Sequence, residues 1–271
     1  MTLNADTGKG ATPFRVTFKG YTLQSSDELI ANIQANENVP ALESVPFHNR
    51  KLAIVGGGPS ILNNIKRLQQ WDGEIWAINK TPDWCAENGI KSVLVSVDAA
   101  LDGWPDPANV TGAIFSSWCA PSVVSRYPNV MVFPMRPYVD HGIPGGSSTA
   151  SSMPVVAALM GYTDITYFGC EGSFIDADHA YCDEQKPHQL IVKANGIDFR
   201  TNPAMYVQCQ ELSEMIKSFN GMLREESGGL LRAMCVDEQW EVVAVSEALK
   251  QLLEETNGAN GCFDKEYRWV I

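Results

Sequence analysis

From residue 51 onward, the sequence alternates short apolar runs with segments of helical character. The runs are KLAIV at 51–55, EIWAIN at 74–79, SVLVSVD at 92–98, GAIFSS at 112–117, VMVFPM at 130–135 and DITYFGC at 164–170. Short apolar strands separated by helices are typical of a mostly parallel sheet that is covered on both faces. The sequence therefore predicts an α/β fold.

The chain is expected to consist of one main domain with two small appendages. Residues 1–49 form an N-terminal appendage, partly disordered, in which Ser25 or Ser26 caps a short helix. Residues 50–235 form the main domain, and residues 236–271 form a C-terminal helical extension packed on the same domain.

The C-terminal third carries clear local signals. Asn195–Gly196 predicts a tight hairpin turn, and Asn202 followed by Pro203 predicts the start of a helix. We interpret GGLLRAMC as one more strand and EVVAVSEALKQLLEE as a closing helix.

Charge and cysteine usage exclude several classes of function. The 32 acidic and 20 basic side chains give a net charge of -12, which disfavours duplex nucleic acid and anionic membranes as partners. The 7 cysteines are scattered without a C-x-x-C pair, which is typical of reduced thiols. Since no apolar run is long enough to span a membrane, we expect a cytoplasmic protein, and a homo-oligomer is compatible with the sequence.

A glycine-rich turn follows the first apolar run. Gly56, Gly57 and Gly58 let a backbone approach an anion closely, Pro59 suits the first turn of a helix, and Ser60 can donate a hydrogen bond. The segment is neither G-x-G-x-x-G nor a Walker A loop, so a tight turn without a ligand is an equal alternative.

Other polar residues end the next apolar runs, where strand ends of a parallel sheet meet. Asn79 could read a base or ribose edge, or it could cap the next helix. Asp98 could hold Mg²⁺ against phosphates, or it could be an N-cap. Ser117 ends the fourth run and is a candidate nucleotide contact.

Candidate residues also lie in the loops. Ser147 and Ser148, in PGGSSTASS, form a second anion cradle or a flexible loop with a serine N-cap. Arg136 is a phosphate clamp or a surface arginine. In the long polar loop, His179 is a general acid or base, a hydrogen-bond donor to phosphate or a metal ligand, or it is merely solvated. Tyr181 in the same loop is a candidate nucleotide contact.

Across about residues 50–235 the chain resembles the MptE-like family, which includes the archaeal 6-hydroxymethylpterin diphosphokinase and has many bacteriophage members. The resemblance rests on IVGGGPSI, WAINK, NGIKSVLVSVDA, GGSSTASSMPVVAALMGYTDITYFGCEGSF and HAY. The G-x-G-P-S turn, the strand-ending Asn and the small-residue helix before GYTDI also look like bacterial CMP-sialic acid sialyltransferases and flagellin motility accessory factors.

This resemblance implies a Rossmann-like three-layer α/β/α fold with a mostly parallel sheet. It also implies a bound nucleotide, with its phosphates at Gly56–Ser60, its nucleoside at Asn79, and Ser147 and Ser148 lining the donor pocket.

The two branches of the resemblance imply different chemistry. In the diphosphokinase branch, Asp98 and Glu171 match the carboxylates that hold Mg²⁺, although Glu171 stands where that branch usually has Asp. In the sialyltransferase branch a histidine base precedes the helix, whereas this chain has Arg200 and Thr201 there, so His179 would have to serve instead.

Three functions follow as expectations. The first is Mg²⁺-dependent phosphoryl or pyrophosphoryl transfer from ATP to an unknown small-molecule acceptor, with Asp98, Glu171 and His179 as catalytic residues. The second is a glycosyltransferase that uses CMP-sugar or another nucleotide sugar. The third is a phage-encoded nucleotide-binding protein without turnover.

Overall fold

The structure is a computed structural model of the whole chain. The residues that it describes are 25–99, 103–136, 138–139, 142–174, 189–219, 221–237 and 239–246. The candidate residues His179 and Tyr181 lie outside these described residues, and so do residues 1–24 of the N-terminal appendage.

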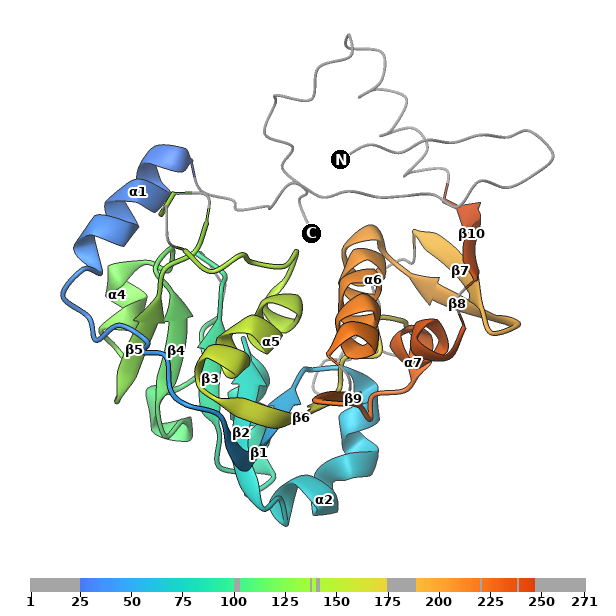
Figure 1. Cartoon of the computed structure of the whole chain (residues 1–271), viewed down its shortest axis with the longest axis horizontal. Helices are drawn as coiled ribbons and strands as arrows, with labels where there is room; N and C mark the ends of the chain where they lie inside the picture. The colour runs from blue at the N-terminus through green and yellow to red at the C-terminus, as the bar shows by residue number, and fades with distance from the viewer. Residues whose placement is uncertain are drawn as a thin grey trace, which may run out of the picture.

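A seven-stranded sheet forms the centre of the molecule (Figure 1). Its order is β5-β4-β3-β2-β1-β6-β9, and every pairing in it is parallel. The strands are β1 (His48–Val55), β2 (Gly73–Ile78), β3 (Val93–Ser96), β4 (Ala113–Ser116), β5 (Val130–Phe133), β6 (Tyr162–Phe168) and β9 (Leu223–Glu225). Each of the six expected apolar runs contains a strand, and the predicted α/β fold is confirmed.

The strand order reverses next to β1. From β1 the chain steps outward through β2, β3 and β4 to β5, and it then returns to place β6 on the other side of β1. The carboxyl ends of β1 and β6 therefore form the switch point, where loops leave in opposite directions. In open α/β sheets this is where ligands usually bind.

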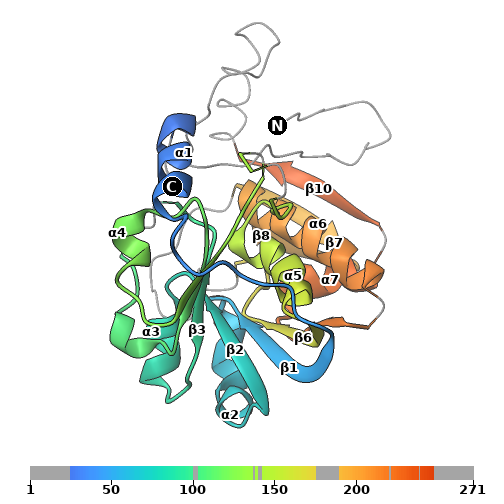
Figure 2. The same ribbon diagram turned by 60° about the vertical axis from the view of Figure 1, so that its left-hand side comes forward.

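Helices cover both faces of the sheet, as Figures 1 and 2 show from two directions. Leu52 and Ile54 of β1 face a cluster to which α5, α6 and α7 contribute, whereas Ala53 and Val55 face η1, α2 and α3. The helices are η1 (Pro59–Asn64), α2 (Ile65–Gln69), α3 (Thr81–Glu87), η2 (Pro107–Asn109), α4 (Pro121–Val124), α5 (Thr149–Leu159), α6 (Pro203–Ser218) and α7 (Gly229–Val236). Alternate side chains of one strand thus serve two layers, which gives the three-layer arrangement.

Helix α5 contains a proline that the sequence alone could not place. Helix α5 begins at Thr149 and continues through Pro154. Proline has no N–H, so the carbonyl of Ala150, four residues earlier, loses its usual helical donor. The hydroxyl of Tyr167, on the neighbouring strand β6, donates to that carbonyl over 2.8 Å.

A second, three-stranded antiparallel sheet has the order β10-β7-β8. Strands β7 (Leu190–Ala194) and β8 (Ile197–Thr201) form the predicted hairpin, with Asn195 and Gly196 both left-handed in the turn (φ 50° and 73°). The predicted start of α6 is also confirmed, because the Asn202 side chain accepts the Met205 N–H.

Two predictions for the C-terminal region were wrong. The segment GGLLRAMC forms helix α7, which buries Leu230, Leu231 and Met234 on one side and packs against α6. The expected C-terminal helical extension begins with strand β10 (Trp240–Val245), paired with β7, where a helix was expected. Residues 247–271 of the extension lie outside the described residues. Short apolar runs fit both structures, and here the neighbouring elements decide between them.

The N-terminal appendage includes helix α1 (Ser26–Ala35), which Ser25 caps in a capping box with Glu28. The side chain of Asn36, at the end of α1, donates to the carbonyls of Ser117 and Cys119 just beyond β4. The appendage is thereby joined to the carboxyl edge of the sheet. Strand β1 begins at His48, so the expected boundary at residue 49 falls inside a strand.

We expect Tyr167→Phe to lower the free energy of unfolding by about 1–3 kcal/mol, because the Ala150 carbonyl is left buried without a donor. Urea denaturation measures this loss. In a Pro154→Ala background the helix regains an N–H for Ala150, so the same substitution at Tyr167 should cost less. Equal costs in both backgrounds would show that Tyr167 does not compensate for the proline.

Candidate functional site

The glycine turn after β1 is joined to the end of β6. Gly56 N–H donates to the Phe168 carbonyl and Gly58 N–H donates to the Gly169 carbonyl, both over 2.8 Å. The Ser60 N–H, at the start of η1, donates to Oε1 of Glu171 over 2.5 Å. Three amides that sequence analysis assigned to a phosphate therefore have partners inside the protein, and phosphate contact at this turn stays a prediction.

The same closeness explains two of the glycines. A Cβ on Gly56 would lie 2.5 Å from the Gly169 carbonyl oxygen, and a Cβ on Gly58 would overlap the Glu171 carboxyl group. Both residues must therefore be glycine for the turn to pack on β6, whether or not a ligand binds.

Glu171 is buried, with 1% of its surface exposed. Its Oε2 has no hydrogen-bond partner, and its carbonyl accepts the Leu231 N–H of α7. Among the described residues no cation forms an ion pair with it. Burial raises the pKa of this carboxyl, and the Ser60 N–H opposes that rise.

A second polar group joins the ends of β2 and β3 to the start of α5. The Asn79 amide donates to Oδ2 of Asp98 over 2.6 Å and accepts the hydroxyl of Thr149 over 3.2 Å. Asn79 adopts a left-handed conformation (φ 54°), which is uncommon outside glycine and often marks a functional position. The three side chains fix one another at the carboxyl edge of the sheet.

Asp98 and Glu171 belong to different hydrogen-bonded groups. Burial raises the pKa of Asp98, while the Asn79 amide opposes the rise.

Mg²⁺ takes several oxygen ligands in octahedral geometry. The described part of the chain contains no group of three or more His, Cys, Asp or Glu side chains that could hold a metal ion. The arrangement offers Mg²⁺ no ready set of ligands, and a magnesium requirement stays a prediction.

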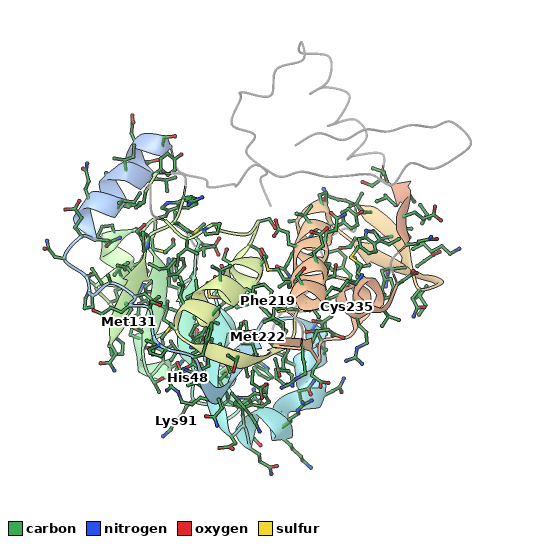
Figure 3. All side chains as sticks on the ribbon, in the orientation of Figure 1. His48, Lys91, Met131, Phe219, Met222 and Cys235 are labelled. Atoms are coloured by element: carbon green, nitrogen blue, oxygen red, sulfur yellow. The ribbon has the colours of Figure 1, made fainter. Side chains whose placement is uncertain are left out.

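Buried polar atoms without hydrogen-bond partners occur at two places along the carboxyl edge, beside β1 and β6 and beyond β4. Among the described residues six such side-chain atoms occur, and four of them belong to residues that follow strands β1, β4 and β6: Ser60 Oγ, Ser117 Oγ, Trp118 Nε1 and Glu171 Oε2. The other two, Trp71 Nε1 and Ser92 Oγ, precede β2 and β3 at the amino edge. His48 and Lys91, labelled in Figure 3, mark that amino edge. Unsatisfied buried groups call for an explanation, and a polar ligand at the carboxyl edge supplies one.

The remaining candidates have distinct surroundings. Ser147 donates its N–H and its hydroxyl to Oε2 of Glu211 on α6, each over 2.8 Å. Ser148 is the N-cap of α5 and accepts the Ser151 N–H. Arg136 is exposed and makes no side-chain contact with the described residues that would fix it as a clamp.

Two residues at this edge were missed by sequence analysis. Thr149, the first residue of α5, was noted only as part of the Gly145–Thr149 loop and was given no role of its own. Glu211 lies in the middle of α6 and carries no local signal, because its role depends on how α6 packs beside α5.

Comparison with known proteins finds no matching family model and no matching curated protein. Among solved structures, the chain is similar to the MAf glycosyltransferase from Magnetospirillum magneticum AMB-1, with a TM-score of 0.58 and 15% identity. The match covers 75% of this chain but 37% of the glycosyltransferase, so this chain corresponds to a minor part of that protein.

This likeness establishes the fold. In the part of the chain that the structure describes, no helix is long and apolar enough to cross a membrane.

We expect the free energy of unfolding of the Asp98→Asn variant, relative to that of the wild type, to increase as the pH rises. Because burial raises the pKa of Asp98 in the folded chain, the unfolded chain loses this proton at lower pH, and folding weakens as the pH rises through the interval between the two values. The substitution removes that weakening. Urea denaturation at about pH 4 and about pH 7 measures the free energy of unfolding of both proteins. The variant should be more stable relative to the wild type at the higher pH than at the lower pH.

Asp72→Asn, which removes a carboxylate from an exposed side chain, is the control for the loss of one charge. A wild-type-to-variant difference at Asp98 that does not change with pH would contradict the assignment.

Proposed function

We propose that this protein is a nucleotide-dependent transferase whose site lies over the carboxyl ends of β1 to β4 and β6. The observation that carries the proposal is the presence of buried polar atoms without partners along this edge, on Ser60 and Glu171 beside β1 and β6 and on Ser117 and Trp118 beyond β4. A polar ligand would satisfy these atoms, and the switch point beside β1 is where such folds bind ligands. Asn79 contacts the nucleoside in this proposal, and the phosphate lies near Ser60.

Transfer of a sugar from a nucleotide sugar is the chemistry that we favour. The two carboxyls at this edge are held by neutral donors, the Asn79 amide and the Ser60 N–H, rather than assembled as a pair around a metal. The likeness in fold to a glycosyltransferase supports the same choice. Asp98 accepts the proton of the acceptor hydroxyl as that oxygen bonds to the sugar, and the nucleotide leaves with the electron pair of the broken bond.

A raised pKa suits Asp98 to this role, since a general base works best when its pKa lies near the working pH. The sequence has no histidine from residue 189 to residue 271, so the base that the sialyltransferase branch places before α6 is replaced here.

Mg²⁺-dependent pyrophosphoryl transfer from ATP is the second candidate. Its supporting observation is that Asp98 and Glu171 both follow strands of the same sheet at the same edge, after β3 and β6. The two candidates differ in a simple measurement. Sugar transfer at this site predicts CMP or another sugar nucleotide as ligand, bound equally well with EDTA, whereas the diphosphokinase predicts ATP binding that requires Mg²⁺.

We expect Asn79→Gly to weaken nucleotide binding about tenfold, because one buried hydrogen-bonding amide is lost at the nucleoside. Glycine keeps the left-handed backbone, but Asp98 and Thr149 each lose a hydrogen-bond partner, so urea denaturation of the variant is measured beside its nucleotide binding. Titration calorimetry with CMP, UDP and ATP measures the change, and release of nucleotide from a panel of nucleotide sugars measures turnover.

The matched control is Asn129→Gly. Asn129 is also left-handed (φ 46°), but it precedes β5 at the amino edge, where its amide donates to the Thr111 carbonyl. Equal effects of the two substitutions would place the nucleotide away from Asn79. Nucleotide binding without turnover of any donor would favour a binding protein over a transferase.

A further inference from the structure

The Glu171 carboxyl group lies where an anionic ligand would contact the first turn. Pro59 has no N–H, so the first amide that η1 offers is that of Ser60, and Oε1 of Glu171 accepts it over 2.5 Å. The rest of the carboxyl group fills the space over Gly58 that a Cβ would occupy. A chain carboxylate thus sits where glycine and a free N–H would otherwise admit an oxyanion.

Two unpartnered atoms show that the chain does not complete this position itself. Oε2 of Glu171 and Oγ of Ser60 are both buried and both lack a hydrogen-bond partner. A buried carboxyl group with one unpartnered oxygen and no paired cation is costly to keep, and a ligand oxyanion at the same place would use the Ser60 N–H and hydroxyl together.

We infer that the Glu171 carboxyl group occupies an anion-binding position over Gly58, beside the Ser60 N–H. A phosphate group of the ligand displaces this carboxyl group from the Ser60 N–H. The inference rests on the proposed function and adds a means of regulation to it. Phosphate binding is weak while the carboxyl group is in place and strengthens when the side chain rotates away.

The backbone around Glu171 restricts the motion to its side chain. The flanking glycines, Gly169 and Gly172, are both left-handed (φ 66° and 62°), and the Glu171 carbonyl accepts the Leu231 N–H over 3.0 Å. The thiol of Cys209 on α6 donates to the same carbonyl. Displacement therefore needs a rotamer change of one side chain and leaves the end of β6 in place.

The neighbouring groups favour release rather than retention. Glu225 of β9 is the charged side chain whose field acts on Glu171, and its negative charge opposes a second one. The thiols of Cys170 and Cys209 are buried and burial raises their pKa values, so both stay neutral and neither one neutralises the Glu171 carboxylate. The Ser60 N–H holds the carboxyl oxygen, with help from the nearby Ser60 hydroxyl and the Glu171 backbone N–H, and no cation among the described residues takes part. A ligand phosphate can take over both donors of Ser60.

The test uses inorganic pyrophosphate as the probe, measured by titration calorimetry on the full chain. Glu171→Ala vacates the position, and we expect it to bind pyrophosphate roughly tenfold more tightly than the wild type, the gain of one charge-assisted hydrogen bond. Glu171→Gln keeps the size of the side chain and should give a smaller gain. Amide hydrogen exchange of Ser60 should be protected by pyrophosphate in Glu171→Ala.

Glu226→Gln is the control, because Glu226 is a more exposed carboxylate beside β9 that pairs with Arg67 and Arg232. An equal gain in this variant would attribute the effect to net charge and overturn the inference. Unchanged pyrophosphate affinity in both Glu171 variants would also overturn it. If Glu171→Ala does not fold, the Glu171→Gln result decides. The probe contains no nucleoside, so this outcome is independent of the Asn79 test of the proposed function.

Discussion

The close contact between the turn after β1 and the end of β6 is the constraint on which the rest of the structure depends. Gly56 and Gly169 approach so closely that a Cβ on either would strike the backbone of the other. This contact joins the halves of the sheet that lie far apart in the sequence, and it creates the switch point beside β1. It also sets Glu171, two residues further on, over Gly58. The glycines are therefore explained first by packing, and the ligand position is a consequence of that packing.

The carboxyl edge of the sheet is organised by neutral hydrogen bonds rather than by ion pairs. Asp98 is held by the Asn79 amide and Glu171 by the Ser60 N–H, and burial raises the pKa of both carboxyls. The ion pairs among the described residues involve Arg67, Arg224 and Arg232, and none of them includes Asp98 or Glu171. An edge of this kind offers a ligand hydrogen-bonding groups rather than fixed charges.

The sequence predicts those parts of the fold that depend on local signals. Apolar runs locate the strands of the large sheet, and Asn202 marks the start of α6 because capping is local. The path of α5 through Pro154 could not be predicted, since it depends on a donor from Tyr167 on another strand. The candidate site follows the same rule. Residues after strands were found from position alone, whereas the Glu171 contact with Ser60 needs the register of β1 against β6.

The small sheet has a consequence for how the protein is made. Its central strand β7 pairs with β8 within a few residues, but its other neighbour, β10, comes from more than forty residues later in the chain. During synthesis one side of β7 therefore stays open until β10 has left the ribosome. An open strand edge is a template for pairing with another chain. Pairing with β10 closes this edge of β7 in the folded protein.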